Sequence, residues 1–140
     1  MTGPVLLDTG PLVAALNRRD RFHPWARSML GVIRPPLHTC EAVLAEACFL
    51  LRGGQGGADA VLALVERGIL AVEFPVSEHT ASIRRLMGKY RDVPMSLADA
   101  CLVRMSELHD GATLWTLDND FRVYRRHRRQ TIPLLMPSEM

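Results

Sequence analysis

Two aspartates in this chain stand where an apolar run ends. Asp8 follows the run at 5–7, and Asp118 follows the run at 113–117. If both runs are buried strands of one parallel sheet, the two side chains lie at the carboxyl ends of strands, where open α/β sheets form their ligand crevices. Aspartate is also a common turn residue after a strand, so either position taken alone fits a turn equally well.

A third acid, Glu46, stands within apolar sequence. The spacing at 41–52 predicts a helix, and the positions three and four residues away on either side are Ala42, Val43, Phe49 and Leu50. We therefore expect Glu46 to lie on a core-facing stripe, where a carboxylate is costly unless it is paired or binds a metal. A structural ion pair would need a buried arginine, and this helix offers none before its last residue. The pattern favours a functional role.

A fourth acid, Asp99, lies in the first turn of a helix that Ser96 is predicted to begin. The helix dipole and the cap favour an acid at this position, which is a sufficient structural reason for it. Its same-face neighbours Met95, Leu102 and Val103 are apolar, however, so Asp99 also borders the expected core. The two roles are compatible, because a metal ligand also benefits from a helix N-terminus.

If these four carboxylates converge, they cannot all stay ionised without compensation, because each raises the pKa of the others. A divalent cation would supply that compensation. All-oxygen ligation suits Mg²⁺ or Mn²⁺, whereas zinc usually takes His or Cys, and the five histidines form no H-x-H or H-E-x-x-H pair. Such a cation lowers the pKa of bound water and stabilises charge on a phosphate, so the cluster predicts phosphodiester hydrolysis.

The bulk composition fits one folded domain spanning 1–140. The chain has 140 residues, 48% of them hydrophobic, a mean hydropathy of +0.05 and a net charge of +2, which is enough for a single sizeable core. No apolar run approaches the ~18 residues of a membrane span, and no charged-then-apolar leader opens the sequence. We therefore expect a cytoplasmic protein. The three cysteines lack C-x-x-C spacing and fit buried free thiols.

Apolar runs alternate with helical periods along the chain. This alternation predicts an α/β fold, a three-layer α/β/α sandwich around a parallel sheet. The expected strands are 5–7, 37–39, 70–74, 113–117 and 132–135. The expected helices follow residue 8, cover 24–30, 41–52 and 58–67, and begin after Ser77 and at Ser96. The glycine-rich loop at 53–57 lacks G-K-[ST], so we interpret it as a helix–helix connection with Gly68 capping the next helix.

Four short segments together resemble the PIN-domain family, and within it the VapC-type toxins of bacterial and archaeal toxin–antitoxin pairs. They are LDTGPLV at 7–13, VLAEA at 43–47, YRDVPMSLADA at 90–100 and TLDNDF at 116–121. They follow the family order over most of the chain. The resemblance implies an endoribonuclease with a twisted parallel sheet, one or two Mg²⁺ or Mn²⁺ ions, a homodimer and an antitoxin partner.

The resemblance also assigns roles to residues. The family's acidic positions fall on Asp8, Glu46, Asp99 and Asp118, with Asp120 as a further acid near the site. Asp8, Asp99 and Asp118 would hold the metal, while Glu46 would complete its shell or orient the attacking water. Attack of that water on the phosphate would leave a 5′-phosphate on the RNA. The family's hydroxyl positions, which often hydrogen-bond the ligands, fall on Thr9, Ser96 and Thr116. The structural alternatives are a turn residue for Thr9, a helix cap for Ser96 and a strand residue for Thr116. For Ser96 the helix cap is at least as good an interpretation.

Sixteen of the 17 basic residues are arginine, and five of them follow the last acids of the site directly. These five are Arg122, Arg125, Arg126, Arg128 and Arg129. We predict that this basic segment binds the RNA backbone, because an acidic site alone repels RNA. The alternatives are a solvated basic hairpin and a surface covered by an acidic partner; Arg125 could instead pair with an acid in the core. A different RNA path would use Arg18, Arg19 and Arg21.

Three other functions are alternatives to a toxin nuclease. A haloacid-dehalogenase-like phosphatase needs a second aspartate two residues after the first, and Gly10 stands there. A binding module, acting by dimerising and holding a partner that represses DNA, would be favoured by loss of a ligand, and all four acids are present. A stand-alone RNA-processing PIN nuclease is indistinguishable by sequence; a short upstream gene for a DNA-binding partner would separate it from a toxin.

Overall fold

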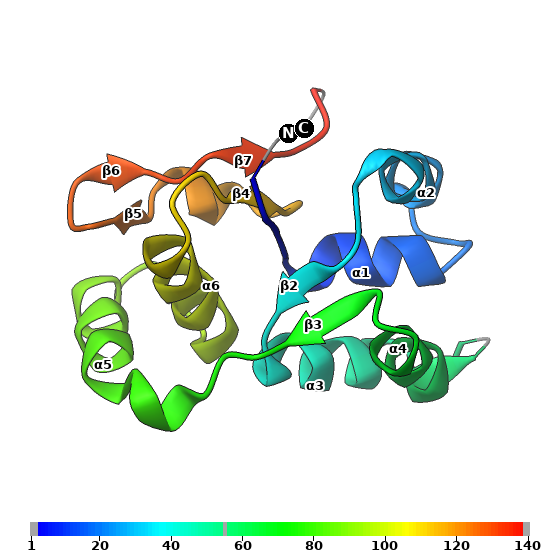
Figure 1. Cartoon of the computed structure of the whole chain (residues 1–140), viewed down its shortest axis with the longest axis horizontal. Helices are drawn as coiled ribbons and strands as arrows, with labels where there is room; N and C mark the ends of the chain where they lie inside the picture. The colour runs from blue at the N-terminus through cyan, green and yellow to red at the C-terminus, as the bar shows by residue number, and fades with distance from the viewer. Residues whose placement is uncertain (1–2, 55, 139–140) are drawn as a thin grey trace.

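The computed structural model describes residues 3–54 and 56–138 and shows an α/β fold (Figure 1). Five parallel strands form the central sheet in the order β3-β2-β1-β4-β7. They are β1 (Val5–Leu7), β2 (Leu37–Thr39), β3 (Leu70–Val72), β4 (Thr113–Trp115) and β7 (Leu134–Leu135). The strands are short and mostly buried because helices cover both faces, as in other parallel sheets.

Six helices flank this sheet (Figure 1), which makes the predicted three-layer sandwich. On one side lie α1 (Thr9–Leu16), α2 (His23–Val32), α3 (Glu41–Leu50) and α4 (Gly57–Glu66); on the other lie α5 (Thr80–Lys89) and α6 (Leu97–Leu108). None of the helices within the described ranges has the length and hydropathy that crossing a membrane requires.

The predicted elements are confirmed with shifted ends. The strands expected at 70–74, 113–117 and 132–135 are two or three residues long, because their last or first residues turn into the loops at the sheet edge. The helix expected after Ser77 divides into a 3-10 turn, η1 (Val76–Glu78), and α5. Gly68 follows α4 with φ of 77°, the left-handed conformation that ends many helices.

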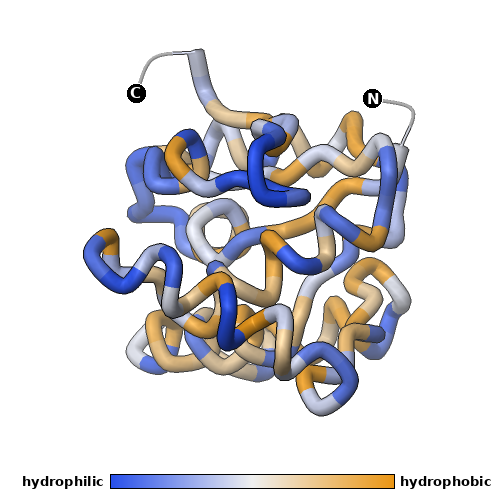
Figure 2. The backbone as a smooth tube through the Cα atoms, turned by 90° about the vertical axis from the view of Figure 1, so that its left-hand side faces the viewer, coloured by the Kyte–Doolittle hydropathy of each residue, from blue (hydrophilic) through white to orange (hydrophobic). Residues whose placement is uncertain are grey.

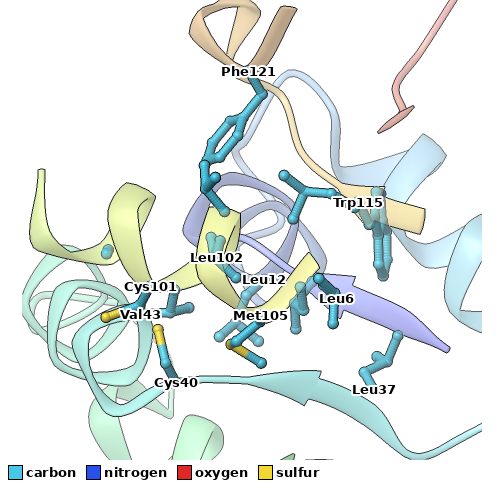
Figure 3. Close-up of a cluster of buried hydrophobic side chains, with 14 of the residues drawn as sticks. Leu6, Leu12, Leu37, Cys40, Val43, Cys101, Leu102, Met105, Trp115 and Phe121 are labelled. Carbon is cyan, nitrogen blue, oxygen red and sulfur yellow. The ribbon is translucent and has the colours of Figure 1, made fainter. Parts of the chain in front are cut away.

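The core lies between β1 and the two helices that begin nearest to it. Figure 3 shows Leu102 and Met105 of α6 beside Leu6 of β1 and Leu12 of α1. All four side chains are at most 3% exposed. Because α1 starts directly after β1, and α6 packs on β1 and β4, this core fixes both helix N-termini at one edge of the sheet.

A small second sheet follows β4. The chain passes through a 3-10 turn, η2 (Asn119–Arg122), into the antiparallel pair β5 (Arg125–Arg126) and β6 (Gln130–Thr131). His127 and Arg128 at its tip have φ of 48° and 71°, as tight hairpin turns require. In Figure 2 this hairpin belongs to the hydrophilic chain facing the viewer near the top of the molecule. The basic segment of the sequence thus begins in η2 and continues through a hairpin at the surface.

Candidate active site

Asp8 connects β1 to α1 and is only 7% exposed. Its Oδ1 accepts a hydrogen bond from the Thr9 amide at 2.8 Å, and its Oδ2 accepts one from the Thr116 hydroxyl at 2.7 Å. Burial raises the pKa of Asp8 from 3.8 to about 6; the two hydrogen bonds oppose this rise, and the charges of Asp99 and Asp118 add to it. A buried carboxylate facing like charges is a group that a cation stabilises.

Asp118 stands at the start of η2, three residues after the end of β4. Its Oδ1 accepts from the Asp120 amide at 2.8 Å, and its own amide donates to the Thr116 hydroxyl at 3.0 Å. The Thr116 hydroxyl therefore bonds Asp8 on one side and the Asp118 backbone on the other. This bridge ties the carboxyl ends of two neighbouring parallel strands together, which brings residues 110 positions apart to one edge.

Asp99 lies in the first turn of α6. Its amide donates to the Ser96 hydroxyl at 3.1 Å, which is the N-cap bond that the sequence predicts. Its Oδ2 accepts a hydrogen bond from the Tyr124 hydroxyl at 2.9 Å. Burial raises the pKa of Asp99, the Tyr124 bond opposes this, and the charge of Asp118 adds to the rise. Helix capping and a place beside the other two acids are thus compatible.

Sequence reasoning missed Tyr124. Its side chain is fully buried, and burial, followed by the hydrogen bond to Asp99 and the charges of Asp99, Asp120 and Asp118, raises its pKa. The hydroxyl therefore stays protonated and acts as a donor. The only sequence signal was an aromatic residue three positions after Phe121 within a strongly basic segment.

Glu46 is exposed, so its expected place on a core-facing stripe is wrong. The buried residues of α3 are Val43 and Ala47. The apolar neighbours that suggested a core face, Phe49 and Leu50, are themselves 60% and 53% exposed. An apolar neighbour marks the core only if it is itself buried, and here much of the apolar surface of α3 faces solvent. The role of Glu46 as a ligand stays a prediction.

Gly10 has a packing reason to lack a side chain. A Cβ atom built there would lie 3.2 Å from Cβ of Leu117, closer than most such contacts. Leu117 immediately precedes Asp118, so the first turn of α1 and the loop after β4 touch at this point. A larger residue at position 10 would displace the loop that carries Asp118 relative to Asp8.

The donors at this edge of the sheet are hard oxygen atoms. Within residues 3–54 and 56–138, no three His, Cys, Asp or Glu side chains are grouped so that they could hold a metal ion as they stand. The three aspartates nevertheless feel one another's charge, and the buried Thr9 hydroxyl beside them has no hydrogen-bond partner. Carboxylates with an unpaired hydroxyl nearby fit Mg²⁺ or Mn²⁺ by the chemistry of the donor set.

The arginines of the basic segment divide into two groups. Three are exposed: Arg122, Arg128 and Arg129. Arg125 directs its guanidinium to the backbone carbonyls of residues 122–124, and Arg126 donates to the Ser106 carbonyl at 3.2 Å. Arg126 thus ties the hairpin to α6, and Arg125 fixes the backbone that leads into it. The exposed arginines, Arg122 in η2 and Arg128 and Arg129 at the hairpin tip, are the ones available to a ligand.

The alternative basic residues lie elsewhere. A cavity of about 1010 Å³ opens between the α1–α2 and α3–α4 loops, and Arg18, Arg19 and Arg27 line it. None of the three aspartates lines this cavity. A path for RNA along Arg18 and Arg19 would therefore pass the far end of α1 from Asp8.

A parallel sheet with three aspartates at its carboxyl edge defines a class of α/β domain that collects acids at the ends of β1 and β4 and the start of α6. The PIN domain family model matches residues 5–126, and the chain belongs to this family. No curated protein sequence matches the chain significantly.

Solved structures share the fold. The Mycobacterium tuberculosis toxin VapC20, described as cleaving the Sarcin-Ricin loop, superposes with a TM-score of 0.76 at 21% identity, over 90% of this chain and 98% of that one. VapBC2 from Rickettsia felis, bound to a DNA fragment from its promoter, superposes with a TM-score of 0.62 at 15% identity, over 96% of this chain and 98% of that one.

Proposed function

We propose that this protein is a divalent-metal-dependent endoribonuclease and the toxin of a type II toxin–antitoxin pair. The observation that carries the proposal is that Asp8, Asp99 and Asp118 lie at the carboxyl edge of a PIN-domain sheet, where burial raises the pKa of Asp8 and of Asp99 and the charge of Asp118 adds to both rises. A bound cation would offset this repulsion. The solved structures support it, since one is described as a toxin that cleaves the Sarcin-Ricin loop and the other as VapBC2 bound to a DNA fragment from its promoter.

In this proposal the three aspartates hold Mg²⁺ or Mn²⁺. When bound, the cation activates water and stabilises negative charge on the scissile phosphate. The protein's own part is positioning: Thr116 holds Asp8, the Asp120 amide holds Asp118, and Ser96 caps the start of α6, the helix that carries Asp99. Glu46, on exposed α3, is proposed to complete the site when RNA covers it.

The decisive experiment measures cleavage of a structured RNA with Mg²⁺ or Mn²⁺ and with excess EDTA. Cleavage should require the cation and stop in EDTA. Asp99→Asn should abolish cleavage while the protein stays folded, because the amide keeps the shape and the helix cap but loses the charge. Undiminished cutting by metal-free protein, or near wild-type cutting by Asp99→Asn, would overturn the proposal.

The antitoxin partner and the homodimer are proposals of the same kind. An antitoxin gene directly upstream, whose product co-purifies with this chain and inhibits its cleavage, would distinguish a toxin from a stand-alone RNA-processing nuclease. A pure binding module would form the same complex without cutting RNA. Sedimentation of the purified chain over a range of concentrations tests the dimer.

A further inference from the structure

Each of the three aspartates has its own donor within the protein. Asp8 is held by the Thr116 hydroxyl and Asp118 by the amide of Asp120. For Asp99 the donor is the Tyr124 hydroxyl, at 2.9 Å from Oδ2. Asp99 is less buried than Asp8 and is borne on a different element from the other two, so its side chain depends most on a partner to fix its direction.

The Tyr124 ring is held tightly by its neighbours. Its ring is fully buried and packs edge-on against Phe121, at 5.2 Å between ring centroids, and against Tyr90, at 5.1 Å. Its backbone amide donates to the Asp120 carbonyl at 3.1 Å. Close aromatic packing from two sides restricts the movement of a buried ring, which keeps the hydroxyl where it meets Asp99.

We propose that Tyr124 is a positioning residue for Asp99, whose buried hydroxyl holds that carboxylate toward Asp8 and Asp118 and thereby preorganises the site for a divalent cation. The inference rests on the proposed function. Groups that orient metal ligands typically contribute 10–100-fold to metal affinity. The same residue leads into β5, so it joins the acidic edge of the sheet to the basic hairpin.

The chain supplies a matched control. Tyr90 is also a buried tyrosine of the same aromatic cluster, and its hydroxyl accepts from the Arg125 amide at 2.9 Å rather than touching an aspartate. Tyr124→Phe and Tyr90→Phe each remove one buried hydroxyl and one hydrogen bond, so both should lose comparable stability in urea. Only Tyr124→Phe should change the site.

Mn²⁺ binding, followed by isothermal titration and by the electron paramagnetic resonance of free Mn²⁺, tests this directly. We expect Tyr124→Phe to bind Mn²⁺ about 10–100-fold more weakly than wild type and Tyr90→Phe to bind it as wild type does. Raising Mn²⁺ should restore RNA cleavage by Tyr124→Phe. In an Asp99→Asn background, Tyr124→Phe should cause no further loss of Mn²⁺ affinity, because the two residues act as one unit.

The outcomes separate this inference from the proposed function. Wild-type Mn²⁺ affinity in Tyr124→Phe would overturn the inference but not the proposed function. Equally weakened Mn²⁺ binding in Tyr90→Phe would do the same, because it would show that the whole aromatic cluster had loosened. If Tyr124→Phe does not fold, the wild-type protein supplies a second measurement. On Mg²⁺ binding the NMR signal of the Tyr124 Cζ carbon, beside the hydroxyl that bonds Asp99, should shift while that of Tyr90 does not, and an unshifted Tyr124 signal would overturn the inference. Absence of Mn²⁺ binding to wild type would overturn the proposed function and this inference with it.

Discussion

Asp8 shows how one residue can serve structure and chemistry at once. It caps α1 through the Thr9 amide, yet it is almost fully buried beside two like charges. In the folded protein its pKa is raised to about 6 from 3.8. Between pH 3.8 and about 6 the Asp8 carboxyl is ionised in the unfolded chain but still protonated in the folded protein. The free energy of unfolding of the metal-free protein therefore falls as the pH rises through this range.

This predicts a pH dependence that Asp8→Asn removes. The variant should be more stable than wild type at pH 7 without metal, by about 2–3 kcal/mol, because the pKa of Asp8 is raised from 3.8 to about 6. Near pH 4 the two proteins should be equally stable. Urea unfolding in EDTA from pH 4 to 7 measures both proteins. A wild-type stability that rises through pH 6 relative to the variant would contradict the raised pKa.

Glu46 is exposed, so its effect on stability and its effect on cleavage can be measured separately. Because its side chain is in water, Glu46→Gln should change the free energy of unfolding by less than about 0.5 kcal/mol. If it orients water or completes the metal shell, the same variant should lose most RNA cleavage at saturating RNA. Glu41→Gln, another exposed acid on α3, is the control. Full activity in Glu46→Gln would leave three aspartates as the whole acidic site.

At the scale of elements, a buried acid on α6 holds the β5–β6 hairpin in place. Glu107 of α6 has a side chain only 3% exposed; its Oε2 accepts from the His127 amide at 2.7 Å and its Oε1 pairs with Arg104 at 3.2 Å. Lys89 also donates to the Arg128 carbonyl at 3.0 Å. The hairpin is therefore a fixed platform, with the exposed side chains of Arg128 and Arg129 at its tip.

This platform predicts which arginines bind RNA. Exchange of both Arg128 and Arg129 for Gln should flatten the dependence of log K on log salt by roughly 1.4, because each phosphate contact contributes about 0.7 for single-stranded RNA. Gln removes the charge but keeps an unbranched polar side chain at both positions. The control exchanges Arg34 and Arg67, which are exposed and lie outside the basic segment. A slope equal to wild type would move the RNA path toward Arg18 and Arg19.

At the scale of the whole molecule, the parallel sheet brings together acids that are far apart in the sequence. All five strands run in one direction, so the chain leaves every strand at the same edge, and helices that start there also present their N-termini to it. Positions 8, 99 and 118 come together because β1 lies beside β4 and α6 packs on both. A cation bound at this edge would therefore brace three parts of the fold.

Metal binding should accordingly stabilise the whole domain. At 100 times its dissociation constant, Mn²⁺ should raise the free energy of unfolding by about 2.7 kcal/mol, if it binds only the folded state. Urea unfolding at pH 7 with Mn²⁺ and with EDTA measures the gain, and Asp8→Asn should lose it. An equal gain in that variant would place the binding site elsewhere.

The sequence by itself determined the elements and three of the acids. Short apolar runs ending in Asp8 and Asp118, and the Ser96 cap before Asp99, are local patterns, and local patterns decide where strands end and helices begin. Parallel strand order followed from the alternation of strands and helices. The element ends shifted by a few residues, because hydrogen bonds to neighbouring strands decide them.

The tertiary structure alone decided what these acids touch. Thr116 bonds Asp8 across 108 residues and Tyr124 bonds Asp99 across 25, and no local pattern encodes such pairs. It also decided that Glu46 faces solvent and that Arg126 is held by the Ser106 carbonyl. The reason is common to all four: the direction in which a side chain points is set by how its element is rotated against the core, and that rotation depends on the packing of the entire chain.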